Sequence, residues 1–217
     1  MRSKADIVAR LIDPGVIAVV RAQRQEQVLP LSQALLAGGV IAIEITMTTP
    51  NAIAAIREAR AEFGDRAVIG VGTVLDVVTC RHALEAGAEF VVSPILRPEL
   101  VAPCHQADKP VMLGAYTPTE AQLAHEAGAD FIKIFPSDSL GPAYIKALRA
   151  PLPHLKIIPT GIAEAKQVPE LIKAGCVAVG IGSLLAGADV LRDANWPELT
   201  RRAAQFAAMV REARVAS

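Results

Sequence analysis

The stretch that decides the fold is PVMLGAYTPTEAQLAHEAGADFIKIFP, residues 110–136. Two nearly continuous apolar runs, 110–116 and 131–136, enclose a segment at 118–128 in which apolar residues recur every three or four positions. Unbroken apolar runs are typical of parallel strands that are covered on both faces, and the recurrence is typical of an amphipathic helix. The stretch therefore predicts a strand–helix–strand unit.

The same alternation continues along the whole chain. Six further strand-like runs lie at 15–21, 40–46, 67–74, 90–94, 156–161 and 177–183, and further helical patterns include 51–63 and 142–150. Eight strand candidates, each followed by a helix, predict an α/β fold of the (β/α)8 TIM-barrel type. An open doubly wound sheet would produce the same alternation and is the alternative.

Both ends of the chain, and the turns between its units, add to this prediction. Ser3 is a candidate N-cap for an extra leading helix at about 4–13, and 196–213 is expected to form the closing helix. An Ala-Gly pair precedes four of the strands, where glycine suits the left-handed end of a helix. Because no linker or change of composition divides the chain, we expect one barrel domain over residues 1–217.

Composition excludes several classes of function. The 22 Lys and Arg residues balance 22 Asp and Glu residues, so a nucleic-acid partner is not expected. No apolar stretch reaches the roughly 18 residues that span a bilayer, and the N-terminus lacks a signal peptide. The three isolated cysteines form no disulfide framework. We therefore expect a cytoplasmic protein that does not contact membranes.

Lys133 is the strongest candidate for a catalytic residue. In the run FIKIFP it shares one face with Phe131 and Phe135, while Ile132 and Ile134 take the other face. If the isoleucines face the helices, the lysine points into the barrel near the carboxyl ends of the strands, where barrels carry their active sites. An isolated buried ammonium is costly, so the lysine is either paired for structure or used as a nucleophile.

Glu44 is the natural partner of this lysine. It is a lone carboxylate in the apolar run VIAIEIT, and the alternation predicts that it also points inward. It would transfer protons, or serve only as the counter-ion of Lys133. Arg21 and Thr73 end two other strands and could hold a substrate carboxylate, although Arg21 could equally be a solvated loop charge.

Small residues at the ends of the seventh and eighth strands indicate a phosphate site. Gly161, Gly182 and Ser183 lie where barrels often bind phosphate through bare backbone N–H groups. Dinucleotide and Walker-type signatures are incomplete or missing, and no histidines show metal-ligand spacing, so we expect neither a metal ion nor another cofactor.

Taken together and in order, six segments resemble one enzyme family, the class I 2-keto-3-deoxy-6-phosphogluconate and 2-keto-3-deoxy-6-phosphogalactonate aldolases. The segments are EITMTTP (44–50), GVGTVL (70–75), VVSP (91–94), KIFPSDSLGPAYIKAL (133–148), PTG (159–161) and GIGSLL (180–185). The resemblance implies a homotrimer of (β/α)8 barrels and an enzyme of Entner–Doudoroff metabolism. Such a lyase reversibly cleaves a 2-keto-3-deoxy-6-phospho sugar acid to pyruvate and glyceraldehyde 3-phosphate.

The resemblance also implies roles for residues. By position, Lys133 is the Schiff-base lysine and Glu44 the acid/base that acts with a bound water. Thr73 and Pro94 line the pyruvate end, and Phe135 packs beside the lysine. Residues at the phosphate end are Gly161, Ile162, Gly182 and Ser183, with Ile162 standing where relatives carry a second glycine.

One further departure concerns the substrate carboxylate. Phosphogluconate members hold it with an arginine at the position of Thr48, and here Arg21 would take that role. Two alternative reactions stay open on the residues: cleavage of a short unphosphorylated keto acid such as 4-hydroxy-2-oxoglutarate or oxaloacetate, and a phosphosugar isomerase or epimerase using Glu44 as base. A barrel that only binds a metabolite is a third hypothesis.

Overall fold

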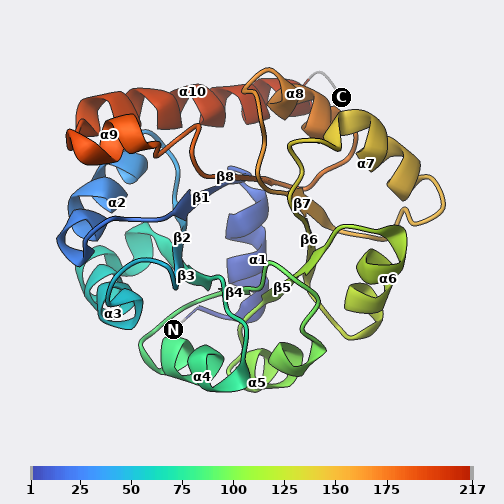
Figure 1. Ribbon diagram of the computed structural model, residues 1–217, viewed down its shortest axis with the longest axis horizontal. Coiled ribbons are helices and arrows are strands. Elements are labelled where there is room, and N and C mark those ends of the chain that lie inside the picture. The colour runs from blue at the N-terminus through green and yellow to red at the C-terminus, as the bar shows by residue number, and fades with distance from the viewer. Residues whose placement is uncertain (1, 216–217) are drawn as a thin grey trace.

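Eight parallel strands form the centre of the molecule. The computed structural model describes residues 2–215 and shows the strands surrounded by helices (Figure 1). The hydrogen-bonded order is β7-β6-β5-β4-β3-β2-β1-β8. The strands are β1 (Val16–Val20), β2 (Ala42–Thr46), β3 (Val68–Gly72), β4 (Val91–Val92), β5 (Val111–Ala115), β6 (Phe131–Ile134), β7 (Ile157–Pro159) and β8 (Val179–Ile181).

The sheet closes on itself as a (β/α)8 barrel. β1 pairs with both β2 and β8, and an isolated parallel bridge between Thr160 and Gly180 joins the β7 and β8 segments. This closure confirms the barrel and excludes the open doubly wound sheet. Arg21 and Thr73, which were expected to end their strands, each lie one residue beyond the last strand residue.

Ten helices of the described residues cover the outside and one end of the barrel. They are α1 (Lys4–Ile12), α2 (Val28–Ala37), α3 (Ala52–Phe63), α4 (Val77–Glu85), α5 (Val101–Gln106), α6 (Pro118–Glu126), α7 (Gly141–Arg149), α8 (Gln167–Lys173), α9 (Ala188–Arg192) and α10 (Trp196–Val215). Three short 3₁₀ turns lie at Gln25–Gln27, Gly64–Arg66 and Pro98–Leu100. The predicted single domain over 1–217 includes residues 1, 216 and 217, which lie outside the described residues.

Two separate cores follow from the alternation of side chains along the strands. Ile43, Ile45, Ile132 and Ile134 belong to the core between the sheet and the helices. A second core fills the barrel, and its members include Ile7, Leu11, Phe90, Met112, Phe131 and Ile158. Because Phe131 lies inside and its neighbour Ile132 outside, the predicted inward direction of β6 is confirmed.

The extra N-terminal helix closes the bottom of the barrel. Ile7 and Leu11 of α1 are fully buried in the inner core, and α1 lies across the barrel axis in Figure 1. The predicted cap is present, because Asp6 N donates to Ser3 Oγ and the Asp6 side chain accepts from Ser3 N. The helix ends before β2, β4, β6 and β8 carry glycines with positive φ: Gly39, Gly87, Gly128 and Gly175.

A charged cluster fixes the bottom of the barrel beside α1. Asp130, whose side chain is 14% exposed, contacts Lys4 Nζ at 2.9 Å and His105 Nε2 at 2.9 Å, and accepts from Val111 N at 3.0 Å. Burial opposes the Asp130 charge, but these three partners together hold the pKa of its carboxyl below the usual value.

Removal of the Asp130 charge is expected to make stability less dependent on pH. A lowered folded-state pKa means that the charge stabilises the protein above the unfolded pKa of about 3.9, and that this contribution disappears as pH falls through the folded pKa. Asp130→Asn should lose about 1–3 kcal/mol at pH 7. Urea unfolding at several pH values should show that the deficit shrinks below about pH 4. Glu85→Gln, at an exposed carboxylate of α4, is the control, and a deficit that does not change with pH would contradict this reading.

None of the helices within residues 2–215 combines the length and the apolar character needed to cross a membrane.

Candidate active site

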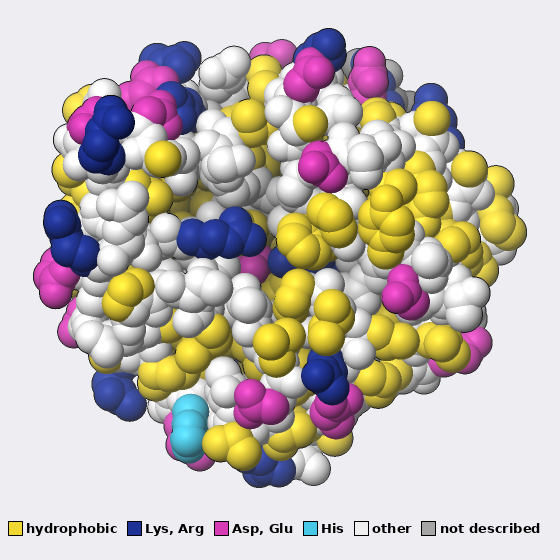
Figure 2. All heavy atoms as spheres, in the orientation of Figure 1, with side chains coloured by type: hydrophobic (Ala, Val, Ile, Leu, Met, Phe, Trp, Pro, Cys, Tyr) yellow, Lys and Arg dark blue, Asp and Glu magenta, His cyan; other side chains and the backbone are white. Residues whose placement is uncertain are grey.

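The inward faces of β2 and β6 bring Glu44 and Lys133 together inside the barrel. The Lys133 side chain is 3% exposed and the Glu44 side chain 2%, and Lys133 Nζ lies 3.5 Å from Glu44 Oε1. The ring centroid of Phe135 lies 5.3 Å from the same Nζ. The face of the molecule drawn in Figure 2 has a hollow in its middle, and acidic and basic side chains lie at the bottom of that hollow. The two groups predicted to be partners are therefore neighbours, screened from bulk water.

Oε1 of Glu44 is an unsatisfied polar atom. It is buried and has no hydrogen-bond partner within the described residues, although Lys133 Nζ lies nearby. A buried polar atom normally has such a partner, supplied by protein, water or ligand. The site thus holds a carboxylate oxygen that is free to bind a water molecule or a substrate hydroxyl, beside a lysine amine.

Gly72 makes room for this carboxylate. A Cβ built on Gly72 would clash with Oε1 and Cδ of Glu44, which lies on the neighbouring strand. The sequence places Gly72 at the end of a strand but gives no sign of this contact, because the contact depends on the register between β2 and β3. Gly72 is therefore a positioning residue for Glu44.

Gly72→Ala is expected to displace the Glu44 carboxylate from Lys133. If Glu44 moves protons in the reaction, kcat should fall about 10- to 100-fold while KM changes less, since part of the general-acid–base contribution is lost. Steady-state kinetics together with a thermal melt would separate this effect from misfolding. A folded variant with the kcat of the unaltered protein would contradict the positioning role.

Thr73 and Pro94 lie on the same side of the site. Thr73 directly follows Gly72 and has a φ of +61°, an uncommon conformation for a residue other than glycine. The backbone of Pro94 lies so close to Gly114 that no Cβ would fit there, and Gly114 N donates to Ile95 O at 3.1 Å. Because Gly114 is the β5 partner of Lys133, Pro94 is held next to the lysine strand.

The glycines expected at the phosphate end border a small cavity of about 70 Å³. It is lined by Arg21, Phe135, Thr160, Gly161, Ile162, Gly182 and Ser183. The structure therefore brings together the four residues predicted for this end, and Phe135 connects them with Lys133. Thr160 was missed by the sequence analysis, although a hydroxyl at a strand end is the signal that selected Thr73.

Arg21 was expected at the carboxylate end, and its side chain lines the cavity with Gly161 and Gly182. A Cβ on Gly182 would lie 3.1 Å from Arg21 Nη1. Arg21 is exposed and makes no hydrogen bond or ion pair within the described residues. Its guanidinium is available to an anion at the mouth of the barrel.

The side chain of Thr48 contacts Thr46, the last residue of β2. Its Oγ1 lies 2.7 Å from Thr46 Oγ1, which also lies 3.0 Å from Val20 O. Thr48 is exposed at the rim, so its hydroxyl is accessible while its position is fixed. Among residues 2–215, no three His, Cys, Asp or Glu side chains come close enough to hold a metal ion between them.

Comparisons with known proteins agree on one family. The family model described as "Aldolase: KDPG and KHG aldolase" matches residues 7–202. A 2-dehydro-3-deoxy-6-phosphogalactonate aldolase from Escherichia coli K12 is 36% identical over 204 residues, which cover 91% of this chain and 95% of that protein.

Solved structures agree in fold as well. A structure described as native KDPGal has a TM-score of 0.85 at 33% identity and covers 91% of this chain and 95% of its own. A KDPG aldolase from Legionella pneumophila, with pyruvate captured as a covalent carbinolamine, has a TM-score of 0.84 at 29% identity, covering 92% and 97%.

Proposed function

Because the chain belongs to the KDPG and KHG aldolase family, we propose that it cleaves a 2-keto-3-deoxy-6-phospho sugar acid through an imine on Lys133. The family makes the chain an aldolase, and hence a lyase. The observation that supports the imine is the buried pair, with Lys133 Nζ 3.5 Å from a Glu44 oxygen that has no hydrogen-bond partner within the described residues.

The reaction begins at the lysine nitrogen. A neutral Lys133 amine attacks the C2 carbonyl of the keto acid and forms a carbinolamine, which loses water to give a protonated imine. Glu44, whose Oε1 lies 3.5 Å from Lys133 Nζ, can accept the proton that the amine must lose and return it to the carbinolamine hydroxyl, which then leaves as water. The carbinolamine named for the Legionella pneumophila relative supports this step.

Cleavage then depends on Glu44. The carboxylate, directly or through a water on Oε1, removes the proton of the C4 hydroxyl while the C3–C4 bond breaks. The bonding electrons move into the imine, giving an enamine of pyruvate and releasing the aldehyde. Protonation at C3 and hydrolysis of the imine release pyruvate and restore the amine. The reverse sequence joins the two products.

The two sides of the site divide the substrate between them. Thr73 and Pro94, beside Glu44 and the lysine strand, border the pyruvate end, with the fixed hydroxyl of Thr48 at the rim. The cavity around Gly161, Gly182 and Ser183 takes the phosphate of the aldehyde half, aided by the Thr160 hydroxyl. Arg21 can reach an anionic group of the substrate from this side.

A substrate panel tests the reaction. Pyruvate release should be measured for the two C4 epimers of the 6-phosphorylated acid and for 4-hydroxy-2-oxoglutarate. We expect kcat/KM for one of the phosphorylated epimers to be at least about tenfold higher than for 4-hydroxy-2-oxoglutarate, since charge-assisted hydrogen bonds to phosphate are worth about 1.5–3 kcal/mol. Equal or better cleavage of the unphosphorylated acid would contradict the phosphate site.

A short unphosphorylated keto acid is the second candidate, and one observation favours it. Ile162 is 7% exposed and lines a cavity of about 70 Å³, a space that holds only a few water molecules. Ile162→Gly should therefore raise kcat/KM for the phosphorylated acid more than for the short acid if the isoleucine restricts phosphate entry.

We also propose that the reaction needs no metal ion, because the protonated imine itself accepts the electrons of the breaking bond. Dialysis against EDTA should leave kcat unchanged within about twofold, and loss of activity restored by a divalent ion would contradict this.

Self-association is a further part of the proposal. Leu75, Val78, Ile95 and Tyr116, which are 43–63% exposed, follow three successive strands β3, β4 and β5. Such a run of exposed apolar side chains is typical of a subunit interface, here of the homotrimer that the resemblance implies. Sedimentation should give a trimer, and Val78→Lys should weaken it.

A further inference from the structure

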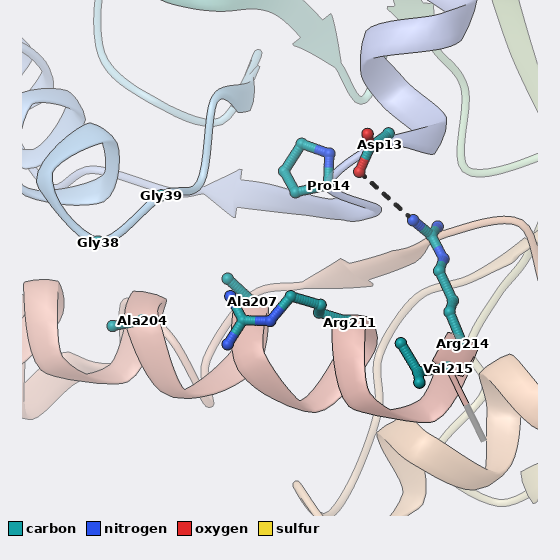
Figure 3. Close-up of a pocket in the computed structure, with 9 residues that line it drawn as sticks. All are labelled: Asp13, Pro14, Gly38, Gly39, Ala204, Ala207, Arg211, Arg214 and Val215. Atoms are coloured by element: carbon teal, nitrogen blue, oxygen red, sulfur yellow. Dashed lines mark ion pairs between the residues drawn. The ribbon is translucent and has the colours of Figure 1, made fainter.

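A second cavity lies at the opposite end of the barrel from Lys133, between α10 and the turns that lead into β1 and β2 (Figure 3). It has a volume of about 520 Å³, within the range of small-molecule sites. Its lining residues are Asp13, Pro14, Gly38, Gly39, Ala204, Ala207, Arg211, Arg214 and Val215. None of these belongs to the site described above.

One of its two arginines is already used by the fold. Nη2 of Arg214 donates to Ile12 O, which closes the end of α1, and to Val177 O at 2.8 Å. Nη1 of Arg214 lies 3.7 Å from Asp13 Oδ1. Arg214 thus satisfies one carbonyl at the end of α1 and another in the turn that leads into β8.

Arg211 has no such role. It is exposed and makes no hydrogen bond or ion pair within the described residues. The nearby end of α2 does not need it, because Gly38 N, Gly39 N and Val40 N already donate to the last carbonyls of that helix. Thr200 Oγ1 adds a bond to Ala34 O at 3.0 Å. The Arg211 guanidinium is therefore free for a ligand.

The walls around this guanidinium are small and largely apolar. Figure 3 shows the Arg211 side chain running back along α10 beside Ala207, on the side of the helix that faces Gly39 and Pro14. Gly39 has a φ of +84°, and a Cβ placed there would lie 4.0 Å from the Ala207 methyl group, so the gap between the turn and α10 stays narrow but open. An aliphatic chain fits such walls.

We propose that this cavity binds a small organic monoanion, a carboxylate with a short aliphatic chain. The carboxylate pairs with the Arg211 guanidinium, and the chain lies against Pro14, Ala204 and Ala207. The carboxylate of Asp13, at the edge of the same cavity, disfavours a dianion such as phosphate.

Titration of the full chain with pentanoate tests this proposal. Methyl signals of Ala204 and Ala207, followed by NMR, should shift with a saturable Kd of about 1–10 mM, as expected for a ligand with so few atoms. Pentanol, with the same chain and no charge, and inorganic phosphate should each bind at least about tenfold more weakly.

Variants locate the site. Arg211→Gln should weaken pentanoate binding at least about tenfold, because a charge-assisted hydrogen bond is lost. Arg57→Gln, at an exposed arginine of α3, and Arg21→Gln, at the other end of the barrel, should leave Kd within about twofold. No saturable shift at either alanine, or an unchanged Kd in a folded Arg211→Gln variant, would overturn the proposal.

Discussion

Lys133→Met is expected to lower kcat/KM by at least about 10⁴-fold, because it removes the amine that forms the imine in the proposed mechanism. The methionine side chain fills a similar volume without a nitrogen. The variant leaves Glu44 buried without its cation, so circular dichroism and a melt must show that the protein is folded. Lys156→Met, at an exposed lysine beside β7, is the matched control and should keep full activity.

Lys133→Arg separates this mechanism from an isomerase or epimerase. Arginine keeps the positive charge but cannot act as the amine nucleophile, because it stays protonated. If Lys133 acted only through its charge and Glu44 were the base, the arginine variant would keep appreciable turnover. We expect it to be as inactive as Lys133→Met, and activity within about tenfold of the unaltered protein would contradict the imine mechanism.

Glu44→Gln is expected to lower kcat about 10²- to 10³-fold, because it removes the group that accepts and returns protons at C4 and at the amine. The amide has the same shape, so KM should change much less. Lys133 remains present in this variant, and covalent trapping of pyruvate should still occur, more slowly. Loss of kcat with trapping retained distinguishes a proton-transfer role from a role limited to holding the lysine.

A second buried carboxylate provides the control for this variant. Glu89 is 3% exposed and forms ion pairs with Arg2 and Arg60 at the bottom of the barrel. Glu89→Gln should lower stability and leave kcat within about twofold, since its partners are far from the reacting atoms. If both variants lost kcat equally, general destabilisation would explain the result and the role of Glu44 would be contradicted.

The central pair could be predicted because it depends only on local alternation. In β2 and β6, isoleucines on one face fix the opposite face as inward, and the order of the strands in a barrel then points Glu44 and Lys133 at the same interior. The same reasoning predicted that the carboxyl ends of the strands lie near one another. The Ala-Gly pairs predicted helix ends, and their glycines, or the glycine that follows, have positive φ.

Features that depend on register or on long side chains could not be predicted. A side chain at position 72 would clash with Glu44 only because the register between β2 and β3 pairs Thr46 with Gly72. Arg21 has a long flexible side chain, so its position near Gly182 could not be read from its place in the sequence. Cys80 and Cys104, isolated in sequence, have Sγ atoms 3.6 Å apart because α4 and α5 are neighbours.

The most direct measurement is reduction with borohydride in the presence of pyruvate, followed by mass spectrometry of the peptides. We predict a covalent three-carbon adduct on Lys133, formed at saturating pyruvate and absent from Lys133→Met. An unmodified Lys133 under these conditions, or an adduct on another lysine alone, would contradict the proposed mechanism.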